Sequence, residues 1–387
     1  MTERVLITGA RAAAALDLAR DFAAAGYEVH LADCTPARMA RWSRVPKATH
    51  RYAPPALDPA SFRRDIARLV TELSPRLVIP TCEEVFHLSA PALADALQER
   101  LFAPPLATLR RLHDKHAFAL ACTEWGLPVP EGLLLESRAY LEGLAGNSSE
   151  WVFKPPFSRF GESALVGPAA AELAQLAPSP VSPLLAQRRV RGEECCFHAF
   201  ARDGKLLAFA AYTSRWRLGG GASFAFSPLA EAQTAPLRAI AESLAASAHL
   251  TGQFACDAII DASGQPWLIE CNPRGTSGVH LLVGNGDLAR AIVSGTPMPE
   301  QPAPAPRHLA PAMVLFGLPL ALRRGAVAEW RATMRQSRDA ISRPGDRLPL
   351  AGALVDAAGF ALSGLRHGIS TTSATTRDIA WNGEELA

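Results

Sequence analysis

The residue types best suited to chemistry gather in one short stretch of the chain, residues 252–274. Its apolar runs predict two antiparallel strands joined by a two-residue turn at 263–264, and counting back from that turn pairs Asp257 with Glu270. Side chains alternate along a strand with period two, so Asn272 is predicted to share their face. Facing carboxylates repel each other unless a cation lies between them, and carboxylate and amide oxygens suit Mg²⁺. The spacing therefore predicts a divalent-metal site.

Two other interpretations of this hairpin stay open on spacing alone. The acids are unrelated if the hairpin is simply exposed to solvent. A three-residue turn with a bulge would shift the register of the two arms and weaken the pairing of Asp257 with Glu270.

The residues at 269–274, Ile-Glu-Cys-Asn-Pro-Arg, together with Asp257 resemble the metal-binding hairpin of the ATP-grasp superfamily. In that family an Asp and a Glu-x-Asn on antiparallel strands hold Mg²⁺ on the phosphates of ATP. The resemblance implies that Asp257, Glu270 and Asn272 bind Mg²⁺ or Mn²⁺. It also implies that Arg274 points at the transferred phosphate or a bound acyl phosphate, the alternative being a capping or surface arginine.

Residues 187–194 resemble the adenosine-binding hinge of the same superfamily. By this match Gln187 and the backbone from Arg188 to Val190 meet the adenine, and Glu194 accepts hydrogen bonds from the ribose hydroxyls. Gln187 stands where the family more often has Glu, but an amide oxygen can still accept from the adenine amino group. A plain antiparallel strand is the alternative for this segment.

Only four of the 39 basic residues are lysines, and two of them fall where the family places phosphate-facing ammonium groups. These are Lys115, opening a helix, and Lys154, ending a strand; a solvated surface lysine is the alternative for each. The loop after Lys154 resembles the family's lid, with Arg159 and Gly161 as candidate nucleotide contacts. It keeps one glycine where many relatives have several, which leaves open a catalytically weak ATP-binding scaffold or sensor.

The loop at 212–223 carries Arg215 and Arg217 on either side of a tryptophan. Arginine forks bind carboxylates in a bidentate way, so the loop could clamp a substrate carboxylate. A loose, glycine-rich hairpin is the equally favoured alternative. For His280, a packed or exposed histidine is favoured over a place in the site.

The first hundred residues alternate apolar strands with helices, which predicts a parallel α/β domain. The turn after the first strand imitates a dinucleotide-binding start, but Arg11 stands where a glycine would admit a pyrophosphate, so a structural βαβ unit is favoured over a dinucleotide-dependent oxidoreductase. The predicted strands lie at 4–8, 27–32 and 76–80, and the predicted helices at 12–25, 58–73 and 83–97. The predicted domains are a pre-ATP-grasp α/β domain at 1–108, a first ATP-grasp lobe at 109–183, a second lobe with the metal site at 184–297, and a small α+β region of unknown role at 298–387.

Composition excludes several other classes of protein. Hydrophobic residues make up 49% of the 387 residues, which suits a globular chain, and 39 Lys+Arg against 37 Asp+Glu give a net charge of +2, which does not support nucleic-acid binding. Uncharged runs such as 308–322 are too short or too interrupted by proline to span a bilayer. Seven cysteines without C-x-x-C spacing and no apparent leader predict a soluble cytoplasmic protein with reduced thiols.

The resemblance extends over residues 1 to about 297. It implies an ATP-dependent ligase that activates a small-molecule carboxylate as an acyl phosphate and joins it to an amine, releasing ADP and phosphate. The expected partners are those small molecules and, as a possible homodimer, a second copy of the chain, with no nucleic acid and no membrane. The identity of the acid and the amine lies beyond the sequence.

Overall fold

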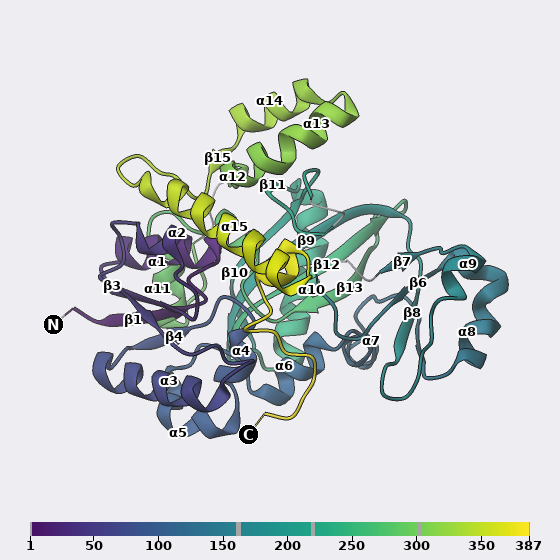
Figure 1. Cartoon of the computed structure of the whole chain (residues 1–387), viewed down its shortest axis with the longest axis horizontal. Helices are drawn as coiled ribbons and strands as arrows, with labels where there is room; N and C mark the ends of the chain where they lie inside the picture. Colours follow the sequence, from purple (N-terminus) through teal and green to yellow (C-terminus); the bar gives the residue numbers. More distant parts are fainter. Residues whose placement is uncertain (1, 160–163, 218–220, 300–303, 387) are drawn as a thin grey trace.

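The computed structural model describes residues 2–159, 164–217, 221–299 and 304–386. Within these residues the strands form three sheets of four, four and seven strands (Figure 1). A parallel sheet comes first along the chain, and two antiparallel or mixed sheets follow it. This agrees with the predicted α/β domain followed by a two-lobed fold.

The first sheet is parallel and has the strand order β3-β2-β1-β4. All residues of β1 after Arg4 are buried, as expected of a strand covered on both faces. β3 is absent from the predicted strands because its sequence, Ala-Thr-His-Arg, is short and polar. The predicted helix at 83–97 is instead three short pieces, since Ala90 before Pro91 is extended and ends the first of them. The elements are β1 (Arg4–Thr8), α1 (Ala13–Ala24), β2 (Glu28–Asp33), α2 (Arg38–Arg41), β3 (Ala48–Arg51), α3 (Pro59–Leu73), β4 (Leu77–Ile79), α4 (Glu84–Leu88), η1 (Pro91–Leu93), α5 (Ala94–Leu97) and η2 (Gln98–Arg100).

The second sheet has the strand order β5-β8-β6-β7 and all its pairs are antiparallel. Because β8 pairs with β5 and β6, the chain changes sheet between Arg188 and Gly192 and not at the predicted boundary of 183. The Asp114 side chain caps the helix that begins at Lys115. The elements are α6 (Leu106–His113), α7 (Lys115–Glu124), β5 (Gly132–Leu135), α8 (Arg138–Leu144), η3 (Ala145–Glu150), β6 (Trp151–Lys154), β7 (Leu165–Val166), α9 (Ala170–Leu173) and β8 (Leu184–Arg188).

The third sheet has the strand order β13-β12-β9-β10-β11-β14-β15 and carries the predicted metal hairpin at one edge. Phe200 and Val279 pack into the same core as the first sheet, so the parallel sheet and this sheet are fixed to each other. The elements are β9 (Gly192–Arg202), β10 (Lys205–Thr213), β11 (Ala225–Pro228), α10 (Glu231–Ser247), β12 (Gly252–Asp261), β13 (Pro266–Asn272), η4 (Ser277–Leu281) and α11 (Asp287–Ser294).

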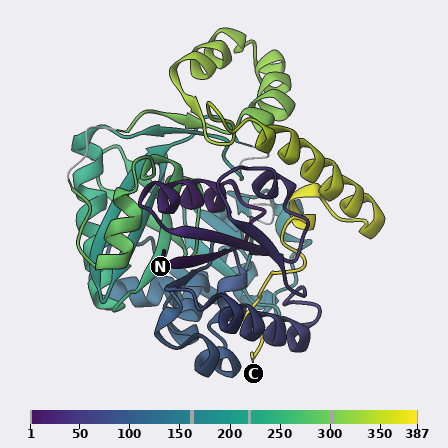
Figure 2. The same cartoon turned by 90° about the vertical axis from the view of Figure 1, so that its left-hand side faces the viewer.

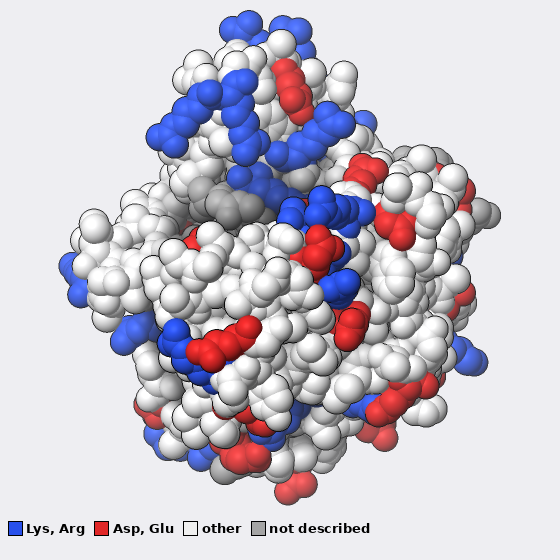
Figure 3. All heavy atoms as spheres, turned by 90° about the vertical axis from the view of Figure 1, so that its right-hand side faces the viewer, with Lys and Arg blue, Asp and Glu red and all other residues white. Residues whose placement is uncertain are grey.

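The C-terminal region contains helices and two short strands, as the predicted α+β region requires, and these strands extend the third sheet through β11. Helices α13 and α14 project from the body, with arginines prominent on this projection where the body below mixes both signs (Figures 1, 2 and 3). After α16 the chain runs back over the N-terminal domain, where Ile379 and Trp381 are buried. The elements are β14 (Arg307–His308), α12 (Ala310–Ala312), η5 (Met313–Gly317), α13 (Leu318–Arg324), α14 (Val327–Gln336), β15 (Arg338–Asp339), α15 (Leu348–His367) and α16 (Thr371–Ala374).

Helix α15 is long and apolar enough to cross a bilayer by length and composition, with a mean hydropathy of 1.5 in its most apolar window. The prediction from uncharged runs passed over it because Asp356 interrupts it. Asp356 pairs with Arg38 at 3.4 Å, and the helix packs against α2. One such helix is only weak support for a membrane span.

Candidate active site

The hairpin formed by β12 and β13 places Asp257 directly opposite Glu270, as predicted. The route to this pairing differs from the prediction. Near the turn Ile260 pairs with Pro266, one residue out of the predicted register, because the turn has three residues. Ile269 then stands unpaired in a bulge on β13, which restores the register. The longer turn and the bulge belong to the alternative left open by the spacing. Each shifts the register by one residue in opposite directions, so the pairing of Asp257 with Glu270 is kept.

The Asp261 side chain explains the longer turn. Its Oδ1 atom accepts hydrogen bonds from the Ser263 N–H at 2.9 Å and the Gln265 N–H at 3.1 Å, and Gly264 takes a left-handed φ of +86°. Hydrogen bonds from the Ser263 hydroxyl, and then from the Trp267 indole N–H, lower the pKa of Asp261 to about 2. The turn is thus built by a local Asx-type motif that a two-residue count overlooks.

The facing carboxylates carry charge that the protein only partly neutralises. Burial and then the Glu270 charge raise the pKa of Asp257, whose Oδ1 atom has the Cys196 thiol as donor at 2.8 Å. Burial would raise the pKa of Glu270 too, but Lys115, 3.4 Å away, and Lys154 lower it. A cation placed between the carboxylates would relieve this repulsion.

The donor set fits Mg²⁺ better than a transition metal. No group of three or more His, Cys, Asp or Glu side chains in the described part of the chain is arranged to hold a metal. A metal at Asp257 and Glu270 would therefore rely on these two carboxylates and the Asn272 amide, with water and phosphate oxygens completing the shell, which is the habit of Mg²⁺.

Arg274 and Asn272 are in contact just beyond the hairpin. An Nη atom of Arg274 donates to the Asn272 Oδ1 at 3.2 Å and lies 3.6 Å from a carboxylate oxygen of Glu83 on the N-terminal domain. The Nε atom of Arg274 is buried and has no hydrogen-bond partner among the residues that the structure describes. The guanidinium is thus held between the hairpin and the N-terminal domain.

The two predicted phosphate-binding lysines converge on the hairpin from the first lobe. Lys154, 4% exposed, donates to the Gln187 Oε1 at 2.9 Å and to the Ile269 carbonyl at 3.3 Å. Burial lowers the pKa of Lys154 to about 8. Lys115 donates to the Ser158 carbonyl at 3.0 Å. The structure thus brings Lys115, Lys154 and Gln187 together.

The predicted hinge crosses from one sheet to the next. Arg188 ends β8 with its guanidinium 5.2 Å from the centre of the Trp151 ring, and Val190 lies in the link that precedes β9. Glu194 is on β9 with a side chain 64% exposed, and it pairs with Arg217. Its carboxylate is accessible to a ribose.

No family model matches this chain, and no curated protein does. Among solved structures, N5-carboxyaminoimidazole synthetase from Staphylococcus aureus complexed with ADP matches with a TM-score of 0.63 and 14% identity, covering 84% of this chain and 87% of that one. L-amino acid ligase from Bacillus licheniformis matches at TM-score 0.56 and 16% identity, covering 76% and 74%. The biotin carboxylase domain of 2-oxoglutarate carboxylase from Hydrogenobacter thermophilus, in complex with MgADP, matches at 0.60 and 15%, covering 78% and 71%.

These neighbours are ATP-grasp structures, as the sequence motifs led us to expect. The chain has the ATP-grasp fold. At these identities the likeness establishes the fold, and the predicted fold class is confirmed.

Three predicted site residues lie apart from the ATP-grasp hairpin or outside the described chain. The Arg215 side chain is 80% exposed and pairs with Glu329 on α14 at 3.6 Å, so it faces the C-terminal projection. The Arg159 guanidinium is paired with the Glu83 carboxylate, so the protein itself already engages this predicted nucleotide contact. Gly161 lies outside the described residues.

The dinucleotide-like turn of the first sheet is filled by the protein itself. The Arg11 guanidinium lies 2.7 Å from the Asp33 carboxylate and 2.6 Å from that of Asp378. The acid that would bind a ribose is therefore engaged, which supports the structural interpretation of this unit. His280 is a packed histidine, as expected, buried and 2.8 Å from Asp17.

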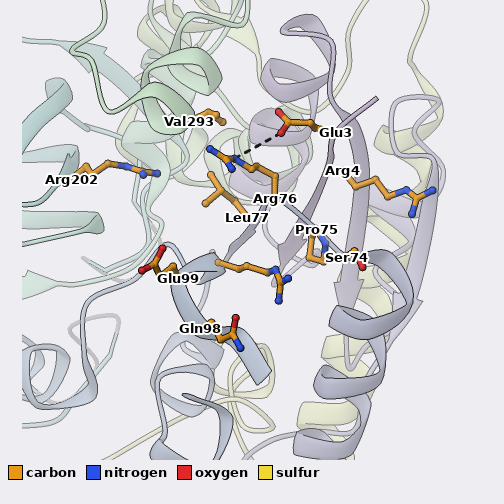
Figure 4. A pocket seen from close by; sticks show the side chains of 11 residues that line it. Glu3, Arg4, Ser74, Pro75, Arg76, Leu77, Gln98, Glu99, Arg202 and Val293 are labelled. Atoms are coloured by element: carbon orange, nitrogen blue, oxygen red, sulfur yellow. Dashed lines mark ion pairs between the residues drawn. The ribbon is translucent and has the colours of Figure 1, made fainter. Parts of the chain in front are cut away.

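A cavity of about 710 Å³ opens at the amino end of the parallel sheet, away from these residues (Figure 4). Arg76 and Arg202 reach into it from opposite walls, and Glu3 pairs with Arg76 at 3.9 Å. None of the predicted site residues lines it. Its size alone does not make it the site of the predicted chemistry.

Sequence reasoning missed three residues that contact the candidate site: Glu83, Cys196 and Trp381. Glu83 follows the carboxyl end of a parallel strand, where ligands of α/β sheets bind, so its position was a usable signal. Cys196 lies two residues after Glu194 on one strand and so shares its face. Trp381 gave no signal, because it reaches the site from the far end of the chain.

Proposed function

We propose that this protein is an ATP-dependent ligase that joins a small-molecule carboxylate to an amine and releases ADP and phosphate. One observation carries the proposal above the others. Asp257 and Glu270 face each other across a hairpin, with Lys115 and Lys154 at its edge, inside an ATP-grasp fold. The ATP-grasp neighbours include structures holding ADP and MgADP, which supports nucleotide binding in this fold.

The nucleotide would lie between the two lobes. Gln187 and the backbone from Arg188 to Val190 would meet the adenine, and Glu194 would accept from the ribose. Lys115 and Lys154 would neutralise the phosphate oxygens as flexible point charges. Lys154 is suited to this because it is already fixed by Gln187 at 2.9 Å.

Asp257, Glu270 and Asn272 would hold Mg²⁺ or Mn²⁺. When bound, the metal supplies positive charge to the phosphate oxygens. The carboxylates themselves gain from this, because burial and then their mutual repulsion raise the pKa of Asp257 in the ligand-free protein.

The reaction then needs positioning and charge more than a reactive side chain. A carboxylate oxygen attacks the γ-phosphorus, and the bond from phosphorus to the bridging oxygen breaks to release ADP. The amine nitrogen next attacks the carbonyl carbon of the acyl phosphate, and phosphate leaves with the bonding electron pair. Arg274 would hold the transferred phosphate, and Arg217 would bind the substrate carboxylate.

Two measurements test the proposal. MgADP should raise the melting temperature of the wild type, and purified protein should release phosphate from MgATP when supplied with a panel of carboxylates and amines. D257N and E270Q should lose both effects. D203N is the matched control, because Asp203 lies in an exposed turn at a φ of +50°, a conformation that Asn adopts readily.

Other outcomes separate the remaining alternatives. Stabilisation by MgADP without phosphate release under any condition would favour an ATP-binding scaffold or sensor. Stabilisation by a nicotinamide dinucleotide but not by MgADP would favour an oxidoreductase, although the pairing of Arg11 with Asp33 speaks against it.

A further inference from the structure

The segment after α16, residues 375–385, lies against the candidate site although it is distant from it in the sequence. Its anchor is Trp381, which is fully buried. The Trp381 ring stacks on Phe86 with ring centres 4.7 Å apart, and His113 and Phe157 complete the aromatic pocket. Burial of a whole tryptophan in such a pocket fixes the segment firmly in place.

The backbone around Trp381 is bound to Arg159 and to Glu83, and Glu83 in turn lies 3.6 Å from Arg274. The Trp381 carbonyl accepts from Arg159 at 2.6 Å, and the Asn382 Oδ1 accepts from another nitrogen of the same guanidinium at 2.8 Å. The Trp381 N–H lies 3.4 Å from the Glu83 Oε2. The segment therefore contacts both partners of the ion pair between Glu83 and Arg159.

Glu83 joins this segment to the candidate metal ligands. Its side chain is 2% exposed and lies 2.6 Å from Arg159 and 3.6 Å from Arg274. Burial opposes its ionisation, but Arg274 and Arg159 hold the pKa of Glu83 below its usual value. Arg274 in turn donates to Asn272. A continuous series of contacts thus runs from Trp381 through Glu83 and Arg274 to Asn272.

We propose that Glu83 is a positioning residue for Arg274, and that the C-terminal segment anchored by Trp381 completes the acceptor end of the site. This inference rests on the proposed function. One carboxylate holding two guanidiniums leaves a net positive charge beside the metal ligands. That charge suits a phosphate group carried by the activated substrate.

The first test uses binding, so that it does not depend on turnover. Wild-type protein is saturated with MgADP, and inorganic phosphate is titrated while the melting temperature is followed. We expect E83Q and W381A to weaken phosphate binding about tenfold, the worth of one hydrogen bond to a charged group. MgADP affinity should stay within about twofold, because Lys154 and Gln187 are unchanged. W381F keeps the stacked ring and should retain phosphate affinity.

The matched control is E385Q. Glu385 belongs to the same segment, but its pair with Arg110 is exposed, so its removal should change neither affinity. A double variant, E83Q/R159Q, separates positioning from simple packing. If Glu83 acts on Arg274, removing Arg159 as well should not restore phosphate affinity.

The outcomes are distinguishable from failure of the proposed function. Loss of MgADP binding by the wild type would end the proposed function. Normal MgADP binding with no phosphate binding by the wild type would overturn this inference alone, as would E83Q and W381A proteins that melt at lower temperature yet bind phosphate normally. Where turnover is measurable, we expect the kcat of E83Q and W381A to fall while the KM for ATP stays unchanged.

Discussion

Two aspartates, the buried Asp33 in the parallel sheet and the partly buried Asp257 in the hairpin, show how the molecule separates structure from chemistry. The Asp33 carboxylate lies 2.7 Å from the Arg11 guanidinium and accepts a hydrogen bond from the Thr35 N–H at 2.7 Å. Burial opposes its charge, yet Arg11 lowers its pKa. Asp257 faces Glu270 and accepts a hydrogen bond from the Cys196 thiol. Burial and the negative charge of Glu270 both raise the pKa of Asp257. Burial acts alike on both; they differ in whether the protein supplies the opposite charge.

This difference also decides between two interpretations of the sequence. The dinucleotide-like turn ends at Asp33, whose carboxylate is already paired with the Arg11 guanidinium. Asp378 binds the same guanidinium. The hairpin keeps Asp257, whose charge is opposed by burial and by the facing Glu270. The proposed metal would therefore gain more at the hairpin than a dinucleotide would at the turn. The predictions below set these two regions against each other.

The largest effect should come from D33N, which removes the charge of the satisfied carboxylate. The amide nitrogen would face the Arg11 donors and leave that guanidinium under-compensated, since Asp33 is fully buried. We expect the free energy of unfolding to fall by about 3–5 kcal/mol in urea denaturation. MgADP affinity per folded molecule should be unchanged. A variant of normal stability would show that the cluster is not structural.

The control for D33N is D58N. Asp58 is an exposed N-cap residue that accepts from the Ser61 N–H, and Asn is an equally good N-cap. Its stability should match that of the wild type. This pair separates loss of a buried charge from the chemistry of the Asp to Asn change.

D257N should behave in the opposite way to D33N. Without metal, the substitution relieves repulsion with Glu270, so the melting temperature in EDTA should stay equal or rise. Phosphate release from MgATP should fall about 100-fold or more, the usual cost of removing one electrostatic contact to a transferring group. A large loss of metal-free stability would mean that Asp257 is a structural residue like Asp33.

Much of the site was predictable because it depends on local pattern. Alternation along two strands placed Asp257, Glu270 and Asn272 on one face, and the bulge at Ile269 cancelled the misjudged turn. The family resemblance, with the scarcity of lysine as a hint, predicted Lys115 and Lys154 as phosphate-facing residues, and both lie beside the hairpin. Family resemblance supplied the roles that the spacing alone could not give.

The rest depends on contacts between distant parts of the chain. The strand pattern of β8 does not reveal which sheet it joins, so the lobe boundary was misplaced. Trp381 meets Glu83 across 298 residues, and no local signal marks such a contact. Arg215 and Arg217 look equivalent in sequence, yet one pairs with Glu329 and the other with Glu194.

Lys154 should make nucleotide affinity depend on pH. Burial lowers its pKa from 10.5 to about 8, so it is increasingly uncharged above that pH and must bind a proton to face phosphate. MgADP affinity should be constant below about pH 8 and fall by up to about tenfold per unit above it, measured by calorimetry. In the ligand-free protein, folding stability depends on pH with the opposite sign to MgADP affinity. Stability should rise between about pH 8 and 10.5, because there the unfolded chain holds the proton more tightly.

K154R provides the control for this pH dependence. Arginine stays protonated throughout the range, so the fall above pH 8 should disappear even if overall affinity is lower. K154Q should bind weakly at every pH. A wild-type profile that is flat to pH 10 would show that Lys154 does not contact the nucleotide.

The smallest effect should separate Arg217 from Arg215, the two arginines of one loop. Arg217 is held by Glu194 and by the Ser214 carbonyl at 3.1 Å, and its charge acts on Asp257, so it belongs to the hairpin side. R217A should raise the KM for the carboxylate substrate about three- to tenfold with kcat nearly unchanged, the pattern of a group that binds ground and transition states equally. R215A should change neither constant, because its ion pair with Glu329 is exposed and weak. If R215A proved the more damaging, substrate would have to be bound from the side of α14, and the acceptor end would lie under the C-terminal projection and not beside Asp257.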